Sequence, residues 1–153
     1  MEPGPALARG RRLDEIAEAL PQRASALSRL FLTRSSIGVS RTEGGVLHAL
    51  STQPRRITEL AGREGVTQPA ITLLVNRLQE RGWVDRAADS ADRRAVLVEL
   101  TAEGRAIFDR LRAEYRALLH EDMATLPDED VETLARAVEI LDGLIARLEG
   151  RKA

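Results

Sequence analysis

One set of polar side chains in the sequence has the types and spacing for contact with nucleic acid. Gln68, Thr72 and Asn76 recur at steps of four, and Arg77 follows directly. A glutamine can pair with adenine through two hydrogen bonds, a threonine can donate to base edges or phosphate, and an arginine can grip guanine or phosphate. Side chains at these intervals share one side of a helix. The set therefore suits a helix that lies in the major groove of DNA.

The surrounding stretch, Ile57 to Trp83, has the pattern of a helix-turn-helix. Ala61 allows the two helices to approach closely, and Gly65 can adopt a positive φ in the turn without a Cβ penalty. Thr67 is a good N-cap for the second helix, and Pro69 in its first turn costs no hydrogen bond. The expected buried stripe of the second helix is Ile71, Leu74, Val75 and Leu78. An ordinary helical hairpin is the alternative, but it requires none of these constraints to coincide.

The second helix supplies most of the candidate DNA contacts, which are Thr67, Gln68, Pro69, Ala70, Thr72, Leu73, Asn76 and Arg77. Leu73 is unusual on a face expected to meet solvent. One interpretation gives it a thymine methyl group as an apolar partner. The other makes it a partly buried flank of the core. The sequence alone leaves both open.

A β-hairpin is predicted after the second helix, with strands at residues 84–86 and 95–100 and a polar tip between them. The tip carries Asp92, Arg93 and Arg94. Such a tip can enter a minor groove, where the negative potential favours arginine. Asp92 could orient Arg94 or Arg77 by a charge-assisted hydrogen bond. Taken alone, this tip is more often a solvated turn, but beside a recognition helix DNA contact is favoured. Arg86, at the end of the first strand, is the remaining candidate wing contact.

The other elements are helices, so the predicted fold class is mainly α with a small β-hairpin wing. Residues 1–12 are expected to form a flexible tail before a single domain at 13–153. Within it, a helix over 13–37 is expected to kink or break at Pro21, and Ser40 or Thr42 is expected to cap a short helix. The winged-helix region is predicted at 40–100. Helical segments follow over 101–150, divided at Pro127.

The sequence offers no catalytic or metal-binding pattern. His48 and His120 lack the spacing of a helical zinc motif, and Gly44-Gly45 is only a pair rather than a phosphate-binding loop. The absence of cysteine excludes disulfides and thiolate metal sites. We therefore expect no enzyme, no cofactor and no metal.

The totals indicate a protein that acts in the cytoplasm without a membrane partner. No stretch approaches the ~18 apolar residues needed to span a bilayer, and residues 1–12 lack the apolar run of a secretory signal. A net charge of −1 does not by itself indicate nucleic acid.

Several of these segments together resemble the MarR family of bacterial transcriptional regulators. The matching runs are Val66-Thr67-Gln68-Pro69-Ala70-Ile71, Asn76-Arg77-Leu78, Gly82-Trp83-Val84-Asp85-Arg86, Asp92-Arg93-Arg94 and Leu100-Thr101-Ala102-Glu103-Gly104. The resemblance follows the order of elements over about 13–148 and is sharp over about 57–104. It implies a winged-helix fold and a sequence-specific regulator that acts as a repressor. Leu73 departs from the pattern, because this position is often arginine in such proteins.

The resemblance also implies a two-fold homodimer, formed by helices at 13–37 and 101–150 and bound to a pseudo-palindromic DNA operator. Two apolar stripes are the candidate dimer interface: Leu13, Ile16 and Leu20, and Leu134, Val138, Leu141, Ile145 and Leu148. Packing within one subunit is the alternative for both stripes.

Release from DNA by a small anionic or phenolic effector is a further implication of the resemblance. Phe31, Arg34 and His48 lie on the elements expected to line such a site. The absence of cysteine excludes thiol-based peroxide sensing. A winged helix used as a protein-interaction module, without sequence-specific DNA binding, is the alternative function.

Overall fold

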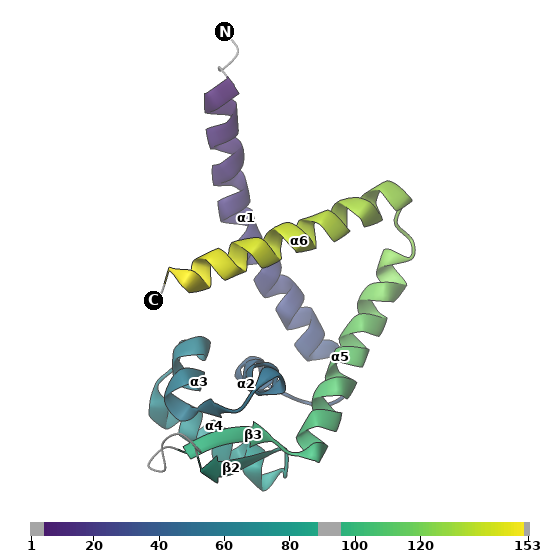
Figure 1. Cartoon of the computed structure of the whole chain (residues 1–153). Coiled ribbons are helices and arrows are strands. Elements are labelled where there is room, and N and C mark those ends of the chain that lie inside the picture. Colours follow the sequence, from purple (N-terminus) through teal and green to yellow (C-terminus); the bar gives the residue numbers. More distant parts are fainter. Residues whose placement is uncertain (1–4, 89–95, 152–153) are drawn as a thin grey trace. The chain divides into compact units, whose positions relative to one another are not determined.

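The computed structural model describes residues 5–88 and 96–151 of the chain (Figure 1). The elements are α1 (Pro5–Arg34), α2 (Arg41–Thr52), β1 (Arg55–Arg56), α3 (Ile57–Glu64), α4 (Gln68–Glu80), β2 (Val84–Ala88), β3 (Val96–Leu100), α5 (Ala102–Met123) and α6 (Asp128–Gly150). They divide between two compact units, residues 1–113 and 114–153. The chain is mainly helical with one small antiparallel sheet, which confirms the predicted fold class.

The buried apolar side chains of the described residues all lie between Val39 and Leu111. They come from one face of each element, and the largest fully buried ones are Val46, Leu47, Leu60, Ile71, Val75, Leu78, Val84 and Val98. Full burial of each such side chain contributes about 1.5–3 kcal/mol relative to exposure. One aliphatic core therefore holds α2, α3, α4, the sheet and the first part of α5 together.

Helix α1 corrects the expected N-terminal tail, because it begins at Pro5 rather than near residue 13. Proline is well suited to a first helical position, where its missing N–H would have no intrahelical partner. Pro21 lies inside the helix without breaking it, so of the expected kink or break only the kink remains. Figure 1 shows the axis of α1 changing direction near its middle. A bend fits the loss of one backbone hydrogen bond at a proline.

Helix α2 begins at a capping box that the sequence partly predicted. Ser40 is the N-cap, and its backbone N–H donates to Glu43 Oε2 at 2.7 Å. The Glu43 N–H in turn donates to Ser40 Oγ at 3.2 Å. The two bonds satisfy backbone donors that have no partner inside the helix. Of the two predicted caps, Ser40 is therefore the one used.

The sheet has the strand order β1–β3–β2, and both pairings are antiparallel. The predicted hairpin is present, with Val84 opposite Leu100 and Ala88 opposite Val96. Strand β1 was not predicted, and it pairs Arg55 with Val98 on the other edge of β3. The sheet therefore joins the segment before α3 to the wing.

Residues 114–151 form the described part of the second unit, with the end of α5 and all of α6. Pro127 separates the two helices, as expected, and is the N-cap of α6. Asp128, Glu129 and Asp130 occupy the first turn of α6, where negative charge favours the positive end of the helix dipole. No residue of α6 is buried in the single chain. Among the described residues, no helix is both long and apolar enough to cross a membrane.

Candidate nucleic-acid interface

The turn between α3 and α4 has the geometry expected of a helix-turn-helix. Gly65 adopts the left-handed conformation at φ 67°, ψ 31°, and its N–H donates to the carbonyl of Ala61. A side chain at this position would be strained, which explains the glycine. Thr67 is the N-cap of α4, and its hydroxyl accepts a hydrogen bond from the Ala70 N–H at 3.4 Å. These two ends fix the direction in which α4 leaves α3.

Helix α4 has one buried side and one exposed side. Its buried residues are Ile71, Leu74, Val75 and Leu78, as predicted. The candidate contacts Thr67, Gln68, Pro69, Ala70, Thr72, Leu73 and Arg77 are exposed, and Asn76 is half-buried. Leu73 is 66% exposed, so the interpretation that it flanks the core is wrong. The helix therefore presents a mixed polar and apolar face to solvent.

Two polar side chains of α4 already have partners inside the protein. The Thr72 hydroxyl donates to the Gln68 carbonyl at 2.9 Å. The Asn76 carbonyl oxygen accepts from the Arg86 guanidinium at 2.7 Å. A bidentate pairing of Asn76 with adenine needs both its amide nitrogen and this oxygen. The bond from Arg86 occupies one of the two lone pairs of that oxygen and fixes the orientation of the amide.

Arg86, predicted as a wing contact with DNA, extends from β2 to α4. Besides Asn76, its guanidinium donates to Gln79 Oε1 at 2.6 Å. The Gln79 amide donates to Asp85 Oδ1 at 3.3 Å, and the same oxygen accepts from the Arg86 backbone N–H at 2.7 Å. The cluster fastens the first wing strand to the recognition helix. Gln79 was not predicted, although its spacing of three from Asn76 places both side chains on one side of α4.

The tip of the wing lies outside the described residues, because the structure describes the hairpin only to Ala88 and from Val96. Asp92, Arg93 and Arg94, and the hydrogen bond expected of Asp92, are among the residues not described. The strands on either side of the tip, β2 and β3, are paired with each other.

A second junction joins the end of α4, the wing and α5. The Thr101 hydroxyl donates to the Gly82 carbonyl at 2.6 Å and accepts from the Gly104 N–H at 3.0 Å. The Thr101 N–H donates to the Trp83 carbonyl at 3.1 Å. A Cβ on Gly104 would overlap that same carbonyl oxygen. Thr101 and Gly104 belong to the runs that resemble the MarR family, and the junction gives a physical reason for both residues.

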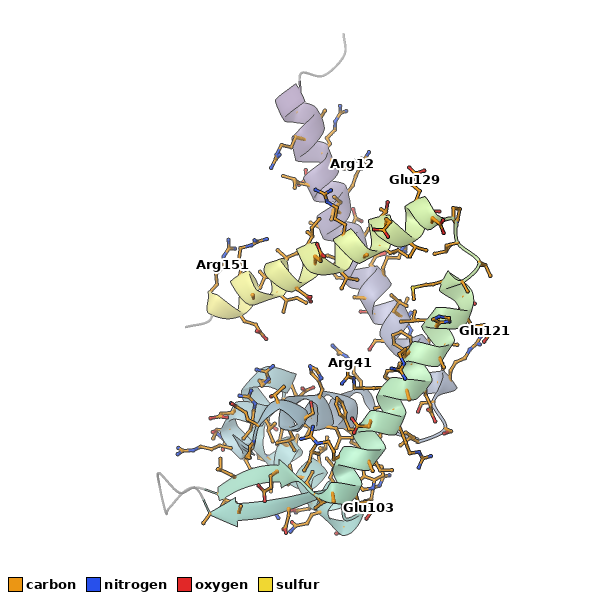
Figure 2. All side chains as sticks on the ribbon, turned by 45° about the vertical axis from the view of Figure 1, so that its right-hand side comes forward. Arg12, Arg41, Glu103, Glu121, Glu129 and Arg151 are labelled. Carbon is orange, nitrogen blue, oxygen red and sulfur yellow. The ribbon has the colours of Figure 1, made fainter. Side chains whose placement is uncertain are left out.

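The Arg81 guanidinium lies 4.8 Å from the ring centre of Trp83, within range of a cation–π contact. Glu103 lies at the N-terminal end of α5 (Figure 2), with its carboxylate beside Gly82. A carboxylate in that first turn favours the positive end of the helix dipole.

Glu43 is the buried charged residue of this region, at 6% exposure. Burial alone raises the pKa of its carboxyl, but the hydrogen bonds with Ser40 and the positive charges of Arg81 and Arg77 outweigh that effect. The net result is a pKa below the usual 4.5. Glu43 therefore stays ionised and holds the start of α2 at neutral pH.

The three residues expected at an effector site lie at two places. Phe31 and Arg34 occupy the end of α1, where Phe31 is half-buried and Arg34 is exposed. His48 is on α2, with its ring centre 6.0 Å from that of Phe108. The Arg112 guanidinium lies 5.9 Å from the same Phe108 ring. Phe108 and Arg112 were not predicted, because they are on α5, far from His48 in sequence.

The candidate dimer residues are open to solvent in the single chain. On α1, Leu13 and Ile16 are exposed and Leu20 is half-buried. On α6, Leu134, Val138, Ile145 and Leu148 are 43–56% exposed and Leu141 is half-buried. Figure 2 shows side chains projecting from both helices.

The fold and this interface define a winged helix-turn-helix protein, and comparison with known proteins shows which family it resembles. The profile of the MarR family matches residues 37–95. The chain is 33% identical over 91 residues to the HTH-type transcriptional repressor YetL of Bacillus subtilis, a match that covers 60% of this chain and 53% of that protein. Over residues 37–95 the chain is therefore similar to the MarR family. It spans about half the length of the curated relatives that it matches first.

Two solved structures extend the comparison to most of the chain. Apo MarR of E. coli has a TM-score of 0.68 and 25% identity, covering 84% of this chain and 95% of that one. NadR, solved in complex with 4-hydroxyphenylacetate, has a TM-score of 0.62 and 24% identity, covering 82% and 91%. The chain therefore shares the fold of known winged-helix proteins.

Proposed function

We propose that the protein is a sequence-specific DNA-binding transcriptional regulator, a homodimeric repressor that acts in the cytoplasm on a pseudo-palindromic operator. The observation that carries the proposal is the exposed face of α4, held beside the first wing strand by the Arg86 cluster. The repressor YetL, to which the chain is similar, supports the assignment. Gln68 and Arg77 contact bases or phosphates from α4, and Arg93 and Arg94 contact the minor groove from the wing.

Dimerisation supplies the second half of the site. One recognition helix covers only a few base pairs, whereas a dimer places two helices about 34–36 Å apart, one turn of DNA. The exposed apolar stripes of α1 and α6 have the composition that such an association requires. In a two-fold dimer the same patch serves both subunits.

Control by a small anionic or phenolic ligand is the third part of the proposal. NadR, which shares the fold, was solved with 4-hydroxyphenylacetate bound. In this chain the aromatic rings of His48 and Phe108, with the guanidinium of Arg112 beside them, offer stacking surfaces and a positive charge. Phe31 and Arg34 are the further candidates for this site.

A retardation assay on the DNA upstream of the protein's own gene tests the proposal. A shift at sub-micromolar protein that weakens steeply with salt is expected, because phosphate contacts supply much of the affinity. Arg94→Ala is expected to lower operator affinity by ~1–3 kcal/mol, and Gln68→Ala to relax the preference at one base pair in each half-site. No shift under these conditions would favour the protein-interaction module instead. If phenolic acids leave the affinity unchanged, ligand control by this class is wrong.

A further inference from the structure

We infer that Leu73 reads the 5-methyl group of a thymine in each operator half-site. The inference rests on the proposed function and adds to it the chemistry of one contacted base. Leu73 is an apolar side chain on the outward face of α4, whose other residues are mostly suited to polar contacts.

Leu73 lies on the side of α4 that points away from the core. With 100° between successive residues, Pro69 and Leu73 fall within about 40° of the direction opposite the buried stripe. Both are exposed, and Leu73 is 66% exposed. When α4 lies in a major groove, these two residues are therefore among the deepest.

The polar neighbours of Leu73 leave part of the base readout to it. The hydroxyl hydrogen of Thr72 is engaged with the Gln68 carbonyl. The carbonyl oxygen of Asn76, one turn beyond Leu73, is engaged with Arg86. The polar groups on either side of Leu73 are thus partly engaged within the protein, while the apolar side chain of Leu73 is open to solvent.

Only one group on the base edges of the major groove is apolar, and that is the methyl group of thymine. A leucine that meets a donor or acceptor edge instead would desolvate it without replacing its hydrogen bond. Burial against the methyl group removes two apolar surfaces from water at once. The partner of Leu73 is thus a thymine.

The experiment begins with a duplex selected by the full-length protein from a random library through repeated retardation. Each thymine of the selected site is then replaced singly by deoxyuridine, which pairs identically but lacks the methyl group. We expect one position in each half-site at which deoxyuridine raises Kd by about fourfold, and about fifteenfold when both half-sites are changed.

Variants of the protein assign that effect to a side chain. Leu73→Ala should bind the thymine and deoxyuridine duplexes equally, and alanine keeps the helix well formed. Leu73→Met, which retains an apolar contact, should keep the sensitivity to the methyl group. Thr72→Ser, which removes only the methyl group of the neighbouring side chain, should keep it as well.

Specific binding without any deoxyuridine effect would overturn the inference and leave the proposed function standing. The same holds if Leu73→Ala remains sensitive to the missing methyl group, because another side chain would then read it. If the selection enriches no duplex at all, the proposed function fails, and this inference fails with it.

Discussion

In the winged-helix region each helix buries a row of aliphatic side chains, whereas neither α6 nor the described side chains of α1 include a single buried residue. Both regions have similar sequence patterns, with apolar residues at steps of three and four. The pattern of α4 is satisfied by α3 and the sheet of the same chain. The pattern of α6, from Leu134 to Leu148, is left open.

This contrast separates two kinds of stability in one chain. The core between Val39 and Leu111 is complete within the single chain. The apolar surface of α1 and α6 contributes only when something covers it. Substitutions in the first region should therefore change the free energy of unfolding, and substitutions in the second should change association.

The largest effect is expected from charges placed in the open stripe. The double variant Val138→Asp, Ile145→Asp should weaken dimer association by at least about a thousandfold, because each buried carboxylate costs several kcal/mol and occurs twice in a two-fold dimer. Sedimentation equilibrium would measure it. As a control, Thr133→Asp with Ile140→Asp adds the same charge away from the stripe. A charged stripe that still dimerises would place the interface elsewhere.

Next in size is the junction between the wing and α5. Gly104→Ala should lower the free energy of unfolding by about 2–3 kcal/mol, because the new Cβ overlaps the rigid backbone carbonyl of Trp83. Urea unfolding measures the difference. The dissociation constant of the dimer should not change by a corresponding amount, because the junction lies in the region whose core is complete within one chain.

Gly45→Ala is a matched control for that substitution. Its added Cβ would also meet a neighbour, but this neighbour is the Glu64 carboxylate, at the end of a flexible side chain. Glu64 can swing into solvent, and alanine favours a helix more than glycine does. Stability should therefore be unchanged or slightly raised. Equal losses in both variants would show that the backbone contact at Trp83 is not the cause.

A smaller effect is expected from Arg86→Ala. Loss of the hydrogen bonds to Asn76 and Gln79 should leave the wing less firmly placed on α4 and weaken operator binding by about tenfold. The salt dependence distinguishes this role from direct contact. Loss of a phosphate contact reduces the slope of log Kd against log salt by about one, whereas a positioning role leaves the slope unchanged.

The smallest effect concerns the capping box of α2. The pKa of Glu43 in the folded protein is below 4.5, so its stabilising contribution is complete above that value and is lost as the pH falls through the lowered pKa. Glu43→Gln should cost about 1 kcal/mol at pH 7. The difference in the free energy of unfolding between variant and parent should disappear in acid. As a control, Glu139→Gln removes a carboxylate that caps no helix and should leave the free energy of unfolding at pH 7 unchanged.

The sequence predicted the parts of this structure that depend on near neighbours. Gly65, Thr67 and Ser40 act within a few residues of themselves, so the turn and both caps were readable from types and spacing. Strand β1 was not, because two residues show no alternation and form a strand only through pairing with β3. The start of α1 was not predicted, because proline and glycine disfavour most helical positions, although proline is tolerated in the first turn, where Pro5 lies.

The candidate site divides in the same way. The exposed side of α4 followed from its buried stripe. The partner of Arg86 did not, because the distance from β2 to Asn76 and Gln79 is set by the packing of the sheet on α4. The same long-range packing decides that Leu73 is exposed.

The Thr101 junction has a mechanical consequence. The Thr101 hydroxyl links Gly82, just after the end of α4, to the first turn of α5. The Thr101 backbone N–H binds the carbonyl of Trp83 at the base of the wing. The recognition helix and the wing are thus anchored to the same end of one long helix. A rotation of α5 would therefore move the recognition helix and the wing together, as one rigid unit.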